Sequence, residues 1–154
     1  MSSFADLFDA TDVVDWKGHE VQPVLRFPVA AGSMVRVRRL GSSSERAQAV
    51  KLAVDQGAMR LARYEGSSIA LWSHSAPAEV ELEIIGHATV LEVWNAWSLD
   101  GVDNAWLGNA GIIAESHANG WTLQCSDGVG DPDFSDLVLW LGIIDVADTT
   151  WLDH

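Results

Sequence analysis

Hydrophobic and polar residues alternate along most of the chain after Trp16, which is the pattern of half-buried β-strands. Residues 34–38 alternate valine with arginine, and residues 79–84 alternate glutamate with valine, leucine and isoleucine. Similar runs span Val21 to Val29, Ala49 to Val54, Ala58 to Tyr64, Ser68 to Ser73, Thr89 to Ser98, Ala105 to Glu115, Trp121 to Ser126 and Leu137 to Asp145. Short Gly, Ser, Asp or Pro segments separate them. Strands at this spacing predict an all-β fold, a two-sheet antiparallel sandwich of jelly-roll-like type.

Two segments also carry helical signals. Residues 3–10 predict a short N-terminal helix, because Ser3 and Asp6 have capping-box spacing. Residues 44–63 contain many helix formers, but the turn signal at residues 55–57 divides them, and we favour a hairpin of two strands. The chain has no long linker and no repeat, so we expect one domain over residues 1–154.

The composition excludes several classes of protein. The single cysteine, Cys125, allows neither an internal disulfide nor a four-cysteine zinc site. The first residues lack the cationic start and apolar core of a secretory signal, so we expect a cytoplasmic protein. The longest apolar run, residues 137–144, is far shorter than the ~20 residues of a membrane-spanning helix, and we expect no membrane partner. The sequence leaves oligomerisation open.

Charge is unevenly distributed along the chain. The net charge is −13, which repels nucleic acid at long range, and we expect no nucleic-acid partner. All nine Lys and Arg residues lie at or before Arg63, whereas residues 65–154 contain fifteen Asp or Glu. We expect this asymmetry to be architectural, with basic strands beside acidic strands in one sheet, because opposite charges across neighbouring strands are stabilising.

The first candidate site is a repeated Asn-Ala-Trp triplet. Residues 95–97 and 104–106 carry it, and the hairpin signal Asp100-Gly101 lies between them. That turn places Leu99 opposite Val102, and alternation then brings four side chains to one face: Asn95, Trp97, Asn104 and Trp106. Indole rings stack on the apolar face of a sugar, and amides bind its hydroxyl groups, so this face predicts carbohydrate binding.

The same face has a second interpretation. Leu91 and Val93 share it, so the hairpin side chains also fit a role in the core of the sandwich. In that case Trp94, which lies on the same face as Glu92, is the alternative exposed platform.

The second candidate site is an acidic loop before the last strand, with four carboxylates in ten residues: Asp127, Asp131, Asp133 and Asp136. Calcium prefers several oxygen ligands from a bent, glycine-containing loop. The alternative is ordinary turn chemistry, in which Asp131-Pro132-Asp133 begins a type I turn and Asp136 caps the strand.

The acidic loop also carries a resemblance. Residues Asp131 to Val138 resemble the Asp-rich turn and following Leu-Val strand of calcium-dependent, lectin-like β-sandwich modules. The resemblance covers about a tenth of the chain, and Ser135 stands where those families usually have Asn. It implies that the carboxylates hold Ca²⁺ beside a sugar.

No catalytic motif supports an enzyme, and the sequence favours a noncatalytic protein. None of the five histidines has zinc-site spacing, and Gly-x-Ser-x-Gly is absent. Two functions remain. The first is a lectin-like carbohydrate-binding domain that uses the Asn/Trp hairpin, with Ca²⁺ as its one candidate cofactor. The alternative is an acidic protein-binding module, of inhibitor, immunity or assembly type, that engages a basic protein partner.

Overall fold

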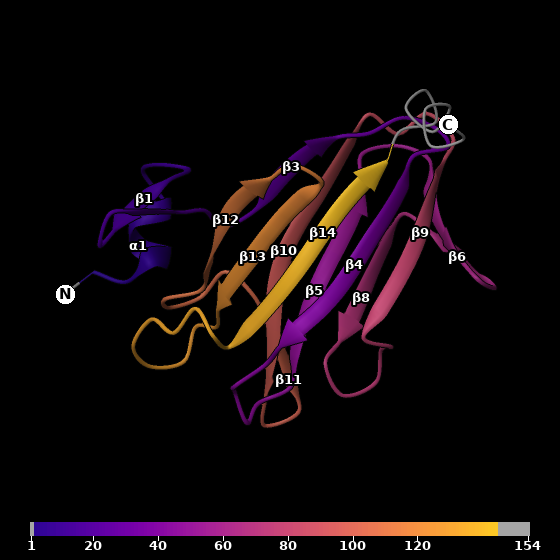
Figure 1. The fold of residues 1–154 in the computed structure, drawn as a ribbon. Coiled ribbons are helices and arrows are strands. Elements are labelled where there is room, and N and C mark those ends of the chain that lie inside the picture. The colour runs from indigo at the N-terminus through magenta and orange to yellow at the C-terminus, as the bar shows by residue number, and fades with distance from the viewer. Residues whose placement is uncertain (1, 145–154) are drawn as a thin grey trace.

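The alternating segments form two facing β-sheets in the computed structural model, which describes residues 2–144 (Figure 1). One sheet has five strands, β3 (Leu25–Pro28), β5 (Gln48–Val54), β8 (Ser68–Trp72), β10 (Val90–Leu99) and β11 (Val102–Asn104). The other has the order β12-β13-β14-β4-β9-β6-β7. Its strands are β4 (Met34–Gly41), β6 (Ala58–Leu61), β7 (Tyr64–Gly66), β9 (Glu79–Ile85), β12 (Gly111–His117), β13 (Gly120–Ser126) and β14 (Leu137–Ile144). The predicted all-β sandwich is confirmed.

The core lies between the two sheets. The inward positions of β5 and β10 face those of β4, β9, β13 and β14, and Leu52, Leu82, Leu91 and Leu123 are fully buried there. Cys125 lies in this core as a small apolar residue. Burial raises the pKa of its thiol well above the usual value.

A smaller unit packs at the β12 edge of the seven-stranded sheet. It consists of helix α1 (Phe4–Phe8) and the pair β1 (Val14–Trp16) and β2 (His19–Val21). The predicted capping box is present, because Ser3 Oγ accepts from Asp6 N while Ser3 N donates to the Asp6 carboxylate. No helix within residues 2–144 has the length and apolar character needed to span a membrane.

The hairpin predicted for residues 44–63 is wrong, although both of its strands are present. β5 pairs with β8 and β10, whereas β6 pairs with β7 and β9 in the other sheet. The chain therefore crosses between sheets at residues 55–57. Asp55 fixes the crossing because its carboxylate accepts hydrogen bonds from Thr89 and Val90 N, which lower the pKa of Asp55. Gly57 has φ +76° and packs against Gly86.

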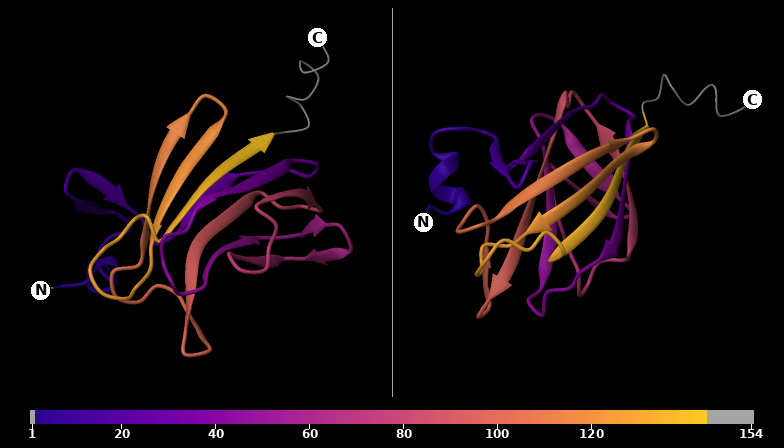
Figure 2. Two further views of the ribbon diagram at one scale, coloured as in Figure 1. Left: turned by 60° about the horizontal axis from the view of Figure 1, so that its bottom comes forward. Right: turned by 60° about the vertical axis from the view of Figure 1, so that its left-hand side comes forward.

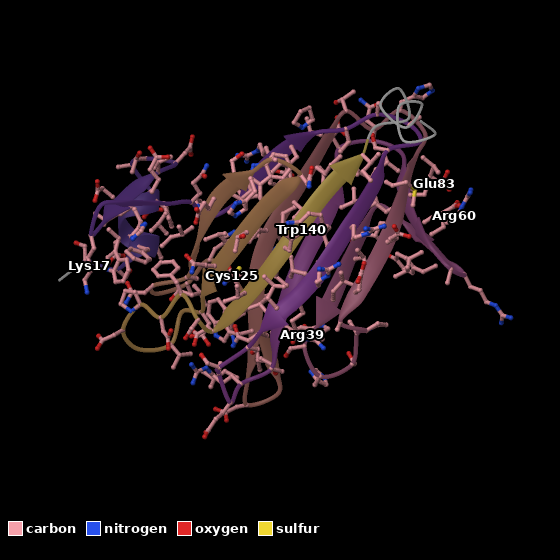
Figure 3. All side chains as sticks on the ribbon, viewed as in Figure 1. Lys17, Arg39, Arg60, Glu83, Cys125 and Trp140 are labelled. Carbon is pink, nitrogen blue, oxygen red and sulfur yellow. The ribbon has the colours of Figure 1, made fainter. Side chains whose placement is uncertain are left out.

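The predicted pairing of basic and acidic strands is confirmed on the outer face of the seven-stranded sheet. β4 and β9 place Arg36 opposite Glu81 and Arg38 opposite Glu79. Guanidinium–carboxylate distances across this pair of strands are 2.6–3.4 Å. Arg60 of β6 extends the row to Glu83 (Figure 3). Part of the charge asymmetry along the sequence is thus compensated within one sheet.

Candidate ligand-binding surface

The β10–β11 hairpin has the register that its Asp-Gly turn predicts, and it extends beyond the rest of the sheet (Figure 2). Leu99 lies opposite Val102, and Trp97 lies opposite Asn104. The expected continuation to Asn95 and Trp106 is wrong. Pairing between these strands ends at Asn104, and Trp106 has φ +57°, a left-handed conformation that turns the chain out of the strand.

Two residues of the predicted face, Asn95 and Trp97, lie in the interior, each with 2% of its surface exposed. Asn95 Nδ2 donates to the carbonyl oxygen of Ser126 at 2.8 Å. The Trp97 ring lies against Gly128, where a Cβ atom would come within 2.5 Å of it. Asn104 is half-buried and donates to its own hairpin at Val102 O. The structure therefore leaves no sugar-sized access to the Asn95 and Trp97 side chains.

The other face of the hairpin presents the exposed aromatic surface. Trp94 points outward from the centre of β10, and the ring of Trp106 stacks on it with a centroid separation of 5.2 Å and an interplanar angle of 27°. Trp106 Nε1 donates to Pro23 O, which holds the ring against the sheet while half of the residue stays exposed. Trp94 and Trp106 thus form one rigid aromatic platform.

Small and aromatic residues are grouped at one part of the outer face of the five-stranded sheet. The register places Ala96, Ala49 and Trp72 in one row, and Trp94, Lys51 and Ala70 in the next. Ala49 and Ala96 are fully buried, and the row beyond Trp94 carries the ion pair of Glu92 with Arg26.

A hollow of about 510 Å³ lies beside the aromatic platform. Trp94 forms one side and Tyr64 of β7 forms another, with Lys51 and Ala70 between them. Tyr64 is 44% exposed, and its hydroxyl donates to Ser68 O, so the ring is held in place at the border of the sheet. The hollow therefore combines two aromatic rings with one ammonium group.

A second hollow of about 410 Å³ lies further along the same face. Trp72 and His74 line it, with ring centroids 6.0 Å apart, together with Ser98 and Asp103. Trp72 follows Ala70 of the first hollow by two residues on β8, which is about 7 Å along a strand. The two hollows are neighbouring parts of one surface, which we call the aromatic face: Lys51, Tyr64, Ser68, Ala70, Trp72, His74, Trp94, Ser98, Asp103 and Trp106.

The acidic loop of residues 127–136 is organised around an internal ion pair. Asp127 is fully buried, and its carboxylate accepts from Arg46 Nε at 2.9 Å and from Arg46 Nη2 at 3.3 Å. Gln48 Nε2 and Val129 N complete its hydrogen bonds at 2.9 and 3.0 Å. The hydrogen bond with Asp127 raises the pKa of Arg46. Both carboxylate oxygens are therefore already in use within the protein.

The other carboxylates of the loop have separate roles. Asp136 is buried and accepts from Asp127 N at 3.0 Å, and burial raises the pKa of Asp136 to about 6. Asp133 Oδ1 accepts from Ser135 N and Oγ, so the tight turn covers residues 133–136 and not residues 131–134 as predicted. Asp131 is exposed.

In this arrangement the loop does not fit a calcium site. A cation at Asp127 has to displace the Arg46 guanidinium, and the remaining carboxylates are used at different points of the loop. Within residues 2–144 no three His, Cys, Asp or Glu side chains are grouped so as to hold a metal ion. Calcium binding stays an untested prediction of the sequence.

The sequence pattern singled out Trp94 and Trp106 but missed the rest of the aromatic face. The pattern predicts Lys51 and Tyr64 only as strand residues, and Trp72 as part of the core or as a plug over a sheet end. A signal was present, because the outward positions of β5 and β8 are mostly alanine and serine with one large aromatic residue. This pattern identifies one continuous face only in combination with the strand order, in which β5 and β8 lie beside β10.

Comparisons with protein-family models, with curated proteins and with solved structures found no significant match.

Proposed function

We propose that this chain is a noncatalytic carbohydrate-binding protein and that the aromatic face is its binding surface. The observation that carries the proposal is the stacked Trp94–Trp106 pair beside an open hollow that Tyr64 also lines. The proposal keeps the ligand class expected from the sequence but moves the site from Asn95 and Trp97 to the opposite side of the hairpin.

A saccharide matches the chemistry of this face better than other ligands do. Its apolar ring face stacks on indole, and its hydroxyl groups need donors and acceptors at the rim, which Ser68, Ser98 and Asp103 supply. Nucleic acid also stacks on aromatic rings, but it needs a run of cations along its backbone. The aromatic face has one lysine and the chain has a net charge of −13, so a phosphate polymer is disfavoured.

The test is a glycan array followed by calorimetric titration of the oligosaccharides that bind. Trp94→Ala and Trp106→Ala are expected to weaken binding at least about tenfold, because each removes half of the stacking platform. Trp140→Ala is the matched control, since Trp140 is a half-buried, outward-facing tryptophan on β14 of the other sheet (Figure 3). Melting temperatures of all three variants check that each one folds.

Two outcomes contradict the proposal. One is an array on which no glycan binds the wild-type chain. The other is a glycan whose affinity falls equally in the Trp94→Ala and Trp140→Ala variants, because loss of binding is then unrelated to the aromatic face.

A basic protein partner is the second candidate, and the N-terminal unit is the observation that favours it. Five exposed carboxylates lie within residues 6–20 and none forms an ion pair with Lys or Arg in the described structure: Asp6, Asp9, Asp12, Asp15 and Glu20. Such a surface accelerates association with a cationic protein. A pull-down whose yield falls steeply with salt, and is lost when these carboxylates become amides, supports this candidate; a salt-independent yield contradicts it.

A further inference from the structure

Lys51 occupies an unusual position for a basic residue of this protein. It lies on β5, inside the five-stranded sheet, with Trp94 of β10 on one side and Ala70 of β8 on the other. Its side chain lines the first hollow and is half-buried. In the described structure no carboxylate lies within ion-pair distance of it. Five arginines have such partners, whereas Lys17, Arg39 and Arg63 also lack one but line neither hollow.

The residues that surround Lys51 in the first hollow offer aromatic, methyl and hydroxyl groups and no counter-ion. The chain has 22 Asp and Glu residues, yet the nearest outward carboxylate on β10, Glu92, pairs with Arg26 of β3 at 3.1 Å. Lys51 is therefore a cation whose partner the protein does not supply.

We propose that the saccharide bound at the aromatic face carries a single carboxylate, as one uronic acid unit does, and that Lys51 binds this group. The inference rests on the proposed function and specifies its ligand. The sugar ring stacks beside Trp94 in the first hollow, and its carboxylate accepts a charge-assisted hydrogen bond from Lys51 Nζ.

The other charged residue of the aromatic face, Asp103, limits the number of acidic sugar units that the ligand carries. The second hollow contains Asp103 and has no lysine or arginine in its lining, so it accepts a neutral sugar and repels a second carboxylate. The net charge of −13 opposes a polyanion further. One acidic sugar flanked by neutral sugars fits both hollows, whereas a polyuronate fits only the first.

The experiment uses oligosaccharides in matched pairs on an array and in calorimetry. One member of each pair carries one glucuronic acid unit, for example glucuronosyl-xylotriose, and the other carries the same unit with its carboxyl group reduced to an alcohol. Oligogalacturonate serves as the polyanion. The acidic member is expected to bind about three- to tenfold more tightly than its reduced partner, and oligogalacturonate is expected to bind more weakly than the acidic member.

Lys51→Met then assigns the preference to a residue. This variant keeps the length of the side chain and removes its charge. It is expected to lower affinity for the acidic member about three- to tenfold and to leave the neutral member within about twofold. Lys51→Arg is expected to keep the preference, and Lys17→Met, in the N-terminal unit, to leave both affinities unchanged.

The outcomes separate the two proposals. Equal binding of the acidic and reduced members, with binding still lost in Trp94→Ala, overturns the role of Lys51 and leaves carbohydrate binding in place. A Lys51→Met variant that weakens both members equally also overturns it, because the lysine then acts on the face and not on the carboxylate. Absence of binding to every pair overturns both proposals.

Discussion

Loss of the Arg46–Asp127 ion pair is expected to be the most destabilising single change of a charged side chain in the described structure. Arg46→Met removes two of the four hydrogen bonds to the Asp127 carboxylate and leaves the charge buried, with Gln48 and Val129 N as its remaining donors. Removing one partner of a buried pair costs about 3–5 kcal/mol.

The lower end of that range applies here because 31% of the Arg46 side chain is exposed, so water reaches the site once the arginine is gone. A loss of about 3 kcal/mol corresponds to a fall in melting temperature of about 6–12 °C for a chain of this size. Arg38→Met is the control. Its partner Glu79 is 45% exposed, and such a pair contributes less than about 1 kcal/mol.

The assay is thermal and urea unfolding of both variants at pH 7. Arg46→Met is expected to lose about 3 kcal/mol of unfolding free energy, and Arg38→Met less than about 1 kcal/mol. An Arg46→Met variant as stable as Arg38→Met refutes the reasoning.

Three further predictions concern the same end of the sandwich. Burial raises the pKa of Asp136 from 3.8 to about 6, so its contribution to stability is present below about pH 4 and is lost as the pH rises through 6. Asp136→Asn is therefore expected to stabilise the fold at pH 7, by at most about 3 kcal/mol, and to flatten the pH dependence of unfolding between pH 4 and 7. Gly128→Ala is expected to cost about 1–3 kcal/mol in urea unfolding, because a Cβ atom there would lie 2.3 Å from Leu107 O and 2.5 Å from the Trp97 ring. Gly41→Ala, with nothing within 4 Å, is the control and is expected to change little. Calcium at millimolar concentration is expected to raise the melting temperature no more than magnesium does, because the Asp127 carboxylate is already paired with Arg46. A larger rise with calcium than with magnesium contradicts this prediction and supports a calcium site in the loop.

Local pattern was sufficient where a turn and a two-residue period decide the structure. The Asp100-Gly101 turn gives the register of Trp97 with Asn104, because one side chain in two faces each side of a strand. It did not give the position of Trp106. That residue lies past the last paired position, where a left-handed backbone conformation and the hydrogen bond to Pro23 O decide which side the ring takes.

Contacts distant in sequence explain the remaining errors. A hairpin and a crossing between sheets can both use an Asp-x-Gly turn, and the difference at residues 55–57 comes from Asp55 binding Thr89 and Val90. The acidic loop similarly has the composition of a metal site, but Arg46, 81 positions earlier in the chain, occupies the carboxylate of Asp127. Neither contact leaves a mark in the local pattern.

The two outer faces of the sandwich differ in how their charged side chains are paired. On the seven-stranded sheet, outward positions of β4 and β9 carry Arg and Glu in register, which satisfies a solvated face without any ligand. On the five-stranded sheet the outward positions of β10 carry Glu92 and Trp94, and Lys51 lies outward on β5. Glu92 is paired with Arg26 of β3, whereas Lys51 has no carboxylate within ion-pair distance in the described structure. We propose that a saccharide carboxylate beside Trp94 neutralises this one unpaired charge, as the arginines and glutamates of the other sheet neutralise one another.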